Sequence, residues 1–191
     1  MSKNLKRILK ESQTPAGGTD RTYQEFMKFL SKDKSLVFAN RPLPGQMLFF
    51  KYNPTNEKFL SIRNTYYDIF PLIFVCEVDK WGFEGINMHY LDPEKREFLF
   101  DAMLKQLPTL TSSKETHDRL LLDYNKVRNM RRLKFFKPCY KRYLLIGLEK
   151  RPIVVPSQYW KTVAMEELGF FMHKKKPSVY TATNKIIAKG K

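Results

Sequence analysis

Residues 71–91 read PLIFVCEVDKWGFEGINMHYL, and this stretch decides the fold. Its first eight residues form a continuous apolar run of strand length, rich in β-branched and aromatic side chains. The next four, DKWG, have the composition of a tight turn. In the remainder, apolar Ile86 and Met88 alternate with polar Asn87 and His89, which is the period of a strand. The stretch therefore predicts an antiparallel hairpin.

The sequence on either side extends this hairpin into a sheet. Residues 47–52 predict a third strand, which a turn at Asn53-Pro54-Thr55-Asn56 closes. Residues 151–155 return to a strand pattern near the other end of the chain. We predict an α+β fold built on a small, curved antiparallel sheet, in the manner of an SH3-like partial barrel.

Three to four helices are expected to decorate this sheet. The strongest helix signal is Asp92-Pro93, because aspartate caps helices well and proline is favoured at the first helical position. That signal predicts a helix over residues 94–106. The other candidate segments for these helices are residues 20–32, 115–132, 137–147 from Lys137-Pro138 onward, and a short segment after Ser157 that carries Trp160.

The 191 residues are expected to form one domain with basic extensions. Residues 1–19 are predicted to be a basic N-terminal arm that ends in a flexible Pro-Gly-rich linker. Residues 20–172 are predicted to form the single α+β domain. Residues 173–191 carry lysines and no acidic residue, so a flexible basic C-terminal tail is expected there.

Several classes of protein are excluded by composition. Charged residues interrupt every apolar run before it reaches membrane-spanning length, so no membrane partner is expected. The basic N-terminus lacks the apolar segment of a secretory leader. Cys76 and Cys139 lie within apolar or aromatic runs and are predicted to be reduced core thiols of a cytosolic protein.

The positive charge of the chain is concentrated in its last third. The whole chain has a formal net charge of +16, and residues 126–191 alone carry +14, whereas residues 20–125 sum to −1. A nearly neutral body with a basic C-terminal third predicts a surface for a polyanion.

The candidate nucleic-acid-binding residues are the cations of two clusters: Lys126, Arg128, Arg131, Arg132, Lys134, Lys137, Lys141 and Arg142, followed by Lys174, Lys175 and Lys176. On an ideal helix the three arginines at 128, 131 and 132 share one face. Lys137 and Lys141 have helical i, i+4 spacing on the next expected helix, so the two faces together suit a phosphate backbone. An acidic protein partner and a merely solvated face are the alternatives, and the tail lysines fit either binding or simple disorder.

Aromatic residues are interleaved with the first basic cluster. Phe135, Phe136, Tyr140 and Tyr143 are predicted either to stack on bases, with a preference for single strands, or to pack into the core.

The sequence predicts no enzyme, catalytic residue, metal site or cofactor. His89 and Asn87 are the most site-like pair, and a histidine that is hydrogen-bonded within a barrel is the preferred interpretation. Zinc-ligand spacings, a phosphate-binding P-loop and the acid-x-Lys pair of many nucleases are absent from the sequence. A divergent nuclease that holds Mg²⁺ through carboxylates such as Asp68, Glu77, Asp79 and Asp92 is the remaining enzymatic alternative.

Three segments, at residues 66–74, 82–91 and 135–144, read YYDIFPLIF, GFEGINMHYL and FFKPCYKRYL. In this order, and followed by a strand, a proline and a Trp-containing helix, they resemble a family of small basic proteins of T4-like tailed bacteriophages. These are virion or DNA-end-protector-like proteins. The resemblance covers roughly residues 45–186 of the chain.

The resemblance implies a non-enzymatic structural protein of the virion that touches the packaged genome near the head–tail connection. Its implied partners are the DNA phosphate backbone, contacted without sequence specificity, and other virion subunits; a homo-oligomer in the particle is left open. Localisation in the virion, and in the host cytoplasm during assembly, follows. The alternative is an architectural tail, neck or baseplate protein whose basic surface binds acidic virion subunits.

Overall fold

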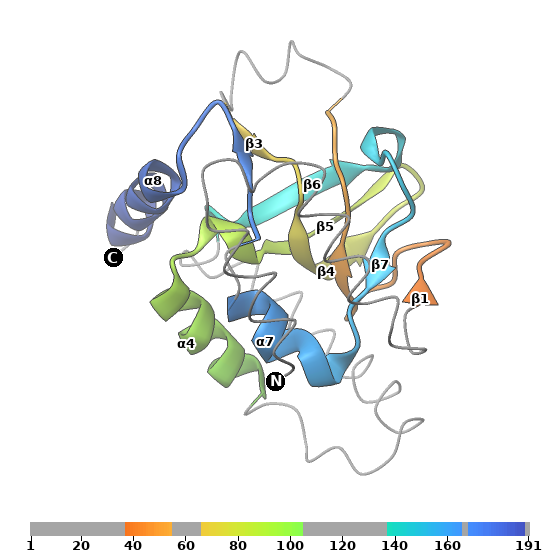
Figure 1. Ribbon diagram of the computed structural model, residues 1–191, viewed down its shortest axis with the longest axis horizontal. Coiled ribbons are helices and arrows are strands. Elements are labelled where there is room, and N and C mark those ends of the chain that lie inside the picture. The colour runs from red at the N-terminus through yellow and green to blue at the C-terminus, as the bar shows by residue number, and fades with distance from the viewer. Residues whose placement is uncertain (1–36, 55–65, 105–136, 166–167, 190–191) are drawn as a thin grey trace, which may run out of the picture.

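The computed structural model describes residues 37–54, 66–104, 137–165 and 168–189 (Figure 1). Its strands are β1 (Val37–Phe38), β2 (Met47–Phe49), β3 (Tyr67–Asp68), β4 (Leu72–Val78), β5 (Gly82–Asn87), β6 (Tyr140–Leu144), β7 (Ile153–Val154) and β8 (Phe171–Met172). Its helices are the 3₁₀ segments η1 (Met88–Tyr90), η2 (Leu145–Gly147) and η3 (Ser157–Tyr159), and the α-helices α4 (Pro93–Leu104), α7 (Trp160–Met165) and α8 (Lys176–Lys189).

The predicted hairpin is the centre of a six-stranded sheet. The strand order is β1-β7-β2-β4-β5-β6, every described pairing is antiparallel, and β3 pairs separately with β8. The expected three-stranded unit of β2, β4 and β5 is confirmed, as is the α+β class. The sheet does not close on itself, because β1 and β6 form its two edges. An SH3-like barrel is therefore not confirmed.

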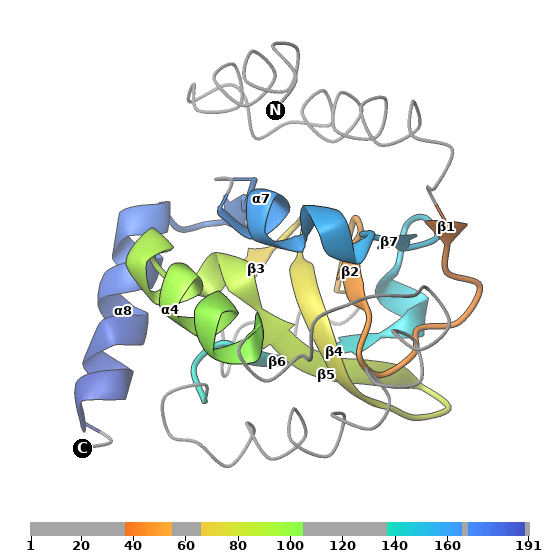
Figure 2. The same ribbon diagram turned by 90° about the horizontal axis from the view of Figure 1, so that it is seen from below.

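The sheet separates two apolar cores, because alternate residues of each strand face opposite sides. On β2, Met47 and Phe49 belong to the larger core, whereas Leu48 belongs to the smaller one. In the larger core, the Trp160 ring meets Phe74 edge-to-face at 5.4 Å. Figure 2 shows that α4, α7 and α8 all lie toward this side of the sheet.

Two of the expected helices are confirmed among the described residues. The helix that was expected over residues 94–106 is α4, and Asp92 caps it by accepting a 3.0 Å hydrogen bond from the Lys95 N–H. The short helix after Ser157 consists of η3 and α7. The arm at residues 1–19 and the helices expected at 20–32 and 115–132 lie outside the described residues.

The helix expected at residues 137–147 is wrong. Tyr140–Leu144 forms β6 instead and pairs with β5 along its whole length. The physical reason is the alternation of two tyrosines with other side chains, which suits a pleated strand better than a helix. The strand expected at 83–91 also ends early, at Asn87, whose side-chain oxygen caps η1 by accepting from the His89 N–H at 2.9 Å.

The expectation of a flexible C-terminal tail is wrong for residues 176–189, which form α8. Val179 and Thr183 lie on one face of this helix and are buried. The Asn184 amide donates a 3.0 Å hydrogen bond to Asp92, at the start of α4. Four-residue spacing of the buried side chains is what lets α8 pack. Within the described ranges, no helix has the length and apolarity needed to cross a membrane.

Candidate nucleic-acid interface

The buried carboxylate of Asp68 joins segments that lie far apart in the sequence. Asp68 is only 2% exposed. Its Oδ1 accepts hydrogen bonds from the N–H groups of Phe70, at 3.1 Å, and Phe170, at 3.2 Å. Its Oδ2 lies 3.1 Å from Asn87 Nδ2 and 2.8 Å from His89 Nδ1. One charged group thus fixes β3 to β5, to η1 and to the residue before β8, and four donors offset its burial.

His89 is hydrogen-bonded inside the fold, as the sequence predicted, although the sheet around it is not a closed barrel. It is fully buried, and this burial lowers its pKa more than the neighbouring Asp68 carboxylate raises it. The imidazole is therefore neutral near pH 7, and its Nδ1–H donates to Asp68. Its Nε2 has no hydrogen-bond partner among the described residues. Asn87 completes the network by donating a 2.8 Å hydrogen bond to the Tyr143 hydroxyl on β6.

Three of the carboxylates that were considered for magnesium, Asp68, Asp79 and Asp92, have hydrogen-bond or ion-pair partners in the protein. Asp68 is saturated by its four donors, and Asp79 Oδ2 lies 2.6 Å from the guanidinium of Arg142. In the part of the chain that the structure describes, no three His, Cys, Asp or Glu side chains group together in a way that suits a metal ion. Cys76 and Cys139 are free, buried thiols, and burial raises the pKa of each to about 12.

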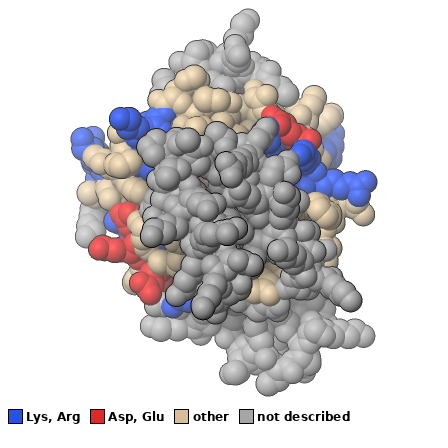
Figure 3. Space-filling model, viewed as in Figure 1, with Lys and Arg blue, Asp and Glu red and all other residues tan. Residues whose placement is uncertain are grey.

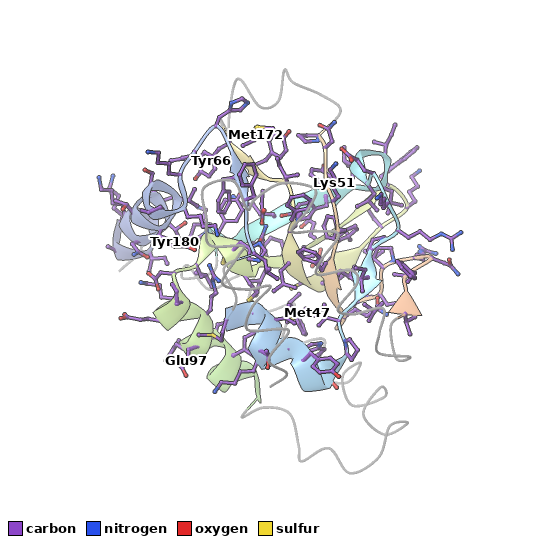
Figure 4. All side chains as sticks on the ribbon, viewed as in Figure 1. Met47, Lys51, Tyr66, Glu97, Met172 and Tyr180 are labelled. Atoms are coloured by element: carbon purple, nitrogen blue, oxygen red, sulfur yellow. The ribbon has the colours of Figure 1, made fainter. Side chains whose placement is uncertain are left out.

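Above the buried network lies a cluster that we call the tyrosine–lysine surface: Tyr66, Tyr90, Phe171, Lys141 and Lys174. The Tyr66 and Tyr90 rings are 6.1 Å apart at an interplanar angle of 30°, and Phe171 meets Tyr90 edge-to-face at 4.9 Å. The ammonium of Lys141 lies 4.2 Å from the centre of the Tyr90 ring, and that of Lys174 lies 4.1 Å from the centre of the Tyr66 ring. Figure 4 labels Tyr66 beside Met172, at the β3–β8 end of the molecule.

Two features of the backbone place the lysines of this surface. Lys141 is on β6, opposite Gly85 of β5, and Tyr90 ends η1. Lys174 follows His173, whose φ of 63° is in the left-handed region, and this conformation turns the chain from β8 toward α8.

The tyrosine–lysine surface draws residues from all three sequence segments that are distinctive in this chain. Tyr66 comes from the first segment, Tyr90 from the second and Lys141 from the third. A protein-family model described as "Phage T4 terminal DNA protecting protein" matches residues 2–189. The chain belongs to this family. No curated protein and no solved structure matches it.

The family match confirms the resemblance that the three segments indicated, and it extends over both basic ends of the chain. In this member of the terminal DNA protecting family, five of the predicted phosphate contacts lie outside the described residues: Lys126, Arg128, Arg131, Arg132 and Lys134.

The other predicted contacts differ in their surroundings. Lys137 and Lys175 are exposed, and Lys176 is the first residue of α8. Arg142 is engaged by two carboxylates, Asp79 at 2.6 Å and Glu84 at 2.9 Å, which raise the pKa of its guanidinium. Because β6 is a strand, the adjacent Lys141 and Arg142 point to opposite faces, so the paired helix faces that the sequence suggested do not form there.

The aromatic residues near the basic cluster also differ in their surroundings. Tyr143 is in the smaller core, where its ring lies 5.7 Å from Phe83 and 5.2 Å from Phe50. Phe135 and Phe136 lie outside the described residues. Sequence reasoning missed Tyr66 and Tyr90 as ring partners of the lysines in this family member. The signal that was available is their position inside the distinctive segments.

Charge is unevenly spread over the described surface of the terminal DNA protecting family member. Figure 3 shows Lys and Arg over α8 and Asp and Glu over the adjacent α4. The α8 sequence includes Lys176, Lys185 and Lys189 and contains no acidic residue. This helix therefore continues the positive potential of Lys174 away from the tyrosine–lysine surface.

Proposed function

We propose that this protein binds the ends of phage DNA as a non-enzymatic virion protein and contacts phosphates without reading the base sequence. The observation that carries the proposal is the match of the terminal DNA protecting family over residues 2–189. A protein that covers a DNA end needs cations for the backbone and has no need of a sequence code.

The charges of the described residues support phosphate contact. Lysine binds phosphate as a point charge on a flexible stem, and Lys137, Lys174, Lys175 and Lys176 supply such groups. Together with Lys141 and the five predicted contacts outside the described residues, these lysines form the proposed binding surface. Arg142 is the weakest candidate, because two carboxylates already hold its guanidinium.

The opposite end of the molecule supports docking to other virion subunits. At the β4–β5 turn, Trp81 is 65% exposed, and its carbonyl accepts a 2.9 Å hydrogen bond from the N–H of Leu145, next to Ile146, which is 76% exposed. Figures 1 and 2 both place this turn across the molecule from α8. Exposed apolar clusters of this kind mark protein contacts. We place the protein near the head–tail connection, and in the host cytoplasm during assembly.

The rival function is an architectural tail, neck or baseplate protein whose lysines meet acidic subunits. The same exposed apolar residues favour an assembly role, so DNA binding must be tested directly. The experiment is binding of the purified full chain to a labelled linear duplex and to a single strand across a salt series. A variant with reversed charges at Arg128, Arg131, Arg132 and Lys137 is measured alongside.

If about six phosphates are neutralised, the log–log salt slope on duplex is about −5, and the variant loses most of the affinity. Weak binding at low salt, unchanged in the variant, would instead favour the architectural role. Adding Mg²⁺ tests the nuclease alternative, because cleavage that depends on the metal contradicts a purely structural protein.

A further inference from the structure

Lys141 is a cation that has no carboxylate partner among the described residues. Its side chain is half-buried beside the Tyr90 ring, and this burial lowers its pKa. None of the described carboxylates pairs with it; its recorded contact is the face of the Tyr90 ring. Burying a charge without an ionic partner is costly. A ligand that supplies the opposite charge would offset this cost.

Lys174 repeats this arrangement on the neighbouring ring. Its ammonium lies 4.1 Å from the centre of the Tyr66 ring, and Tyr66 is itself 6.1 Å from Tyr90. The two ammonium groups therefore lie over two neighbouring tyrosine rings. A single ligand with more than one phosphate could contact both of them. Cation–π contact places an ammonium beside the ring before a ligand arrives, and its N–H groups remain available as donors to a phosphate.

The surface is also held in shape before any ligand arrives. Asp68 ties together the segments that carry Tyr66, Tyr90 and Phe171, through hydrogen bonds of 2.8–3.2 Å. Burial raises the pKa of the Tyr90 hydroxyl well above its usual value, so this residue stays an uncharged ring partner. A prearranged site loses less entropy on binding than a loose one.

We propose that the tyrosine–lysine surface is the binding site for the DNA terminus. Lys141 and Lys174 bind the last phosphates, and the partly buried Tyr66 ring stacks on the terminal base. This inference rests on the proposed function. A base pair inside a duplex hides both of its faces, whereas the last pair exposes one face beside its phosphates. A ring with adjoining ammonium groups fits that combination. Transfer of the Lys174 ammonium from the ring to a phosphate uncovers the stacking face of Tyr66.

The test compares one duplex in two forms, with open ends and with both ends closed by hairpin loops, using the full-length protein. Variants are Lys141→Met, Lys174→Gln and Tyr66→Leu. The matched control is Lys80→Gln, because Lys80 lies 4.9 Å from the centre of the Trp81 ring at the other end of the molecule. We expect wild type and Lys80→Gln to prefer open ends. Each site variant is expected to lose about tenfold in affinity for open ends. Tyr66→Leu should lose little for closed duplex, and the two lysine variants should lose less there than at open ends, because each removes one phosphate contact from the binding surface.

Thermal unfolding separates this role from a structural one. Lys141→Met replaces a half-buried charge that has no described carboxylate partner with an apolar chain of similar length, so its Tm is expected to rise by about 2–4 °C while end binding falls. A fall in Tm would make Lys141 a structural residue and overturn its assignment. Lys174→Gln keeps the test valid if Tyr66→Leu fails to fold.

The outcomes are distinguishable. Site variants that prefer open ends as strongly as wild type would overturn the inference and leave the proposed function standing. Equal wild-type affinity for open and closed duplex would overturn the inference together with the end preference in the proposed function, and phosphate contact would be retained. Absence of salt-sensitive binding by wild type to either form would reject the proposed function itself.

Discussion

Both ends of this molecule place a lysine over an aromatic ring, yet the two ends differ in how they treat charge. At the tyrosine–lysine surface, Lys141 and Lys174 lie over buried or partly buried rings, and no described carboxylate pairs with them. At the β4–β5 turn, Lys80 lies over an exposed Trp81, and the nearby Arg142 is neutralised by acidic side chains. The first end has lysines without described carboxylate partners, which is the charge arrangement that a polyanion site requires. The second end has its arginine paired with carboxylates and exposes apolar side chains, as a protein interface does.

The largest effect is expected from Asp68, the buried support of the first end. Asp68→Ala leaves the N–H groups of Phe70 and Phe170 and the side chains of Asn87 and His89 without their acceptor. Breaking such a network costs about 3–5 kcal/mol in the free energy of unfolding. Chemical denaturation measures this loss, and a cost below about 1 kcal/mol would contradict the role given to the carboxylate.

Two glycines allow the ends to be compared directly. A Cβ at Gly169 would lie 2.7 Å from His89 Cβ, and one at Gly147 would lie 2.6 Å from Tyr52 Cε2. Gly169→Ala and Gly147→Ala are each expected to cost about 1–3 kcal/mol in stability. Only Gly169→Ala should weaken the preference for DNA ends, because it displaces the network under Tyr90. Equal losses of end binding in both variants would remove the distinction between the ends.

Protonation of His89 should weaken the first end in acid. Because burial lowers the pKa of His89 in the folded protein, the unfolded chain binds its proton more readily. Stability is therefore intact above about pH 6.5, the unfolded value, and declines as the pH falls below it, by at most about 1.4 kcal/mol per pH unit. The groups facing the imidazole are Asp68, which favours its protonation, and Arg96 and Lys176, which oppose it.

The measurement is urea denaturation between pH 7.5 and pH 5 for wild type and for His89→Gln. The variant should show a flatter dependence on pH than wild type. Parallel curves would mean that this histidine does not carry the effect.

The smallest effect is expected at the second end. Arg142 is partly exposed, and exposed ion pairs contribute little to stability. Arg142→Gln should change the free energy of unfolding by less than about 1 kcal/mol and leave the salt slope of DNA binding nearly unchanged. If the substitution reduced the salt slope by about one unit, which corresponds to one phosphate contact, Arg142 would have to exchange its carboxylate partners for a DNA phosphate.

Sequence alone was sufficient for the parts of the fold that local physics dictates. The apolar run at residues 71–78 predicted β4, and Asp92-Pro93 predicted the start of α4. It failed at β6, where Lys141 and Arg142 obscured the alternation of the tyrosines. The prediction also failed at α8, because the lysines without acidic partners indicated a tail although Val179 and Thr183 have the four-residue spacing of a packed helix.

The candidate site was harder to predict than the fold. Basic charge in the C-terminal third placed Lys141 and Lys174 among the predicted DNA contacts, but nothing local associates them with Tyr66 and Tyr90. That association depends on the pairing of β3 with β8 and of β5 with β6. Contacts between distant segments depend on the topology of the whole fold, so patterns among neighbouring residues in the sequence do not predict them.

The pairing of β3 with β8 has a consequence for the order of events as the chain is made. The hydrogen bond from the Phe170 N–H to Asp68 spans 102 residues, whereas β4 and β5 are joined by a short turn. Contacts that close long loops form late, because their entropic cost must be met first. A nascent chain can therefore form the β4–β5 hairpin well before Lys174 reaches Tyr66, whereas the pairing of β7 with β1 and β2 also closes a long loop. Competence to hold a DNA end should arrive last, after the C-terminal residues have been synthesised.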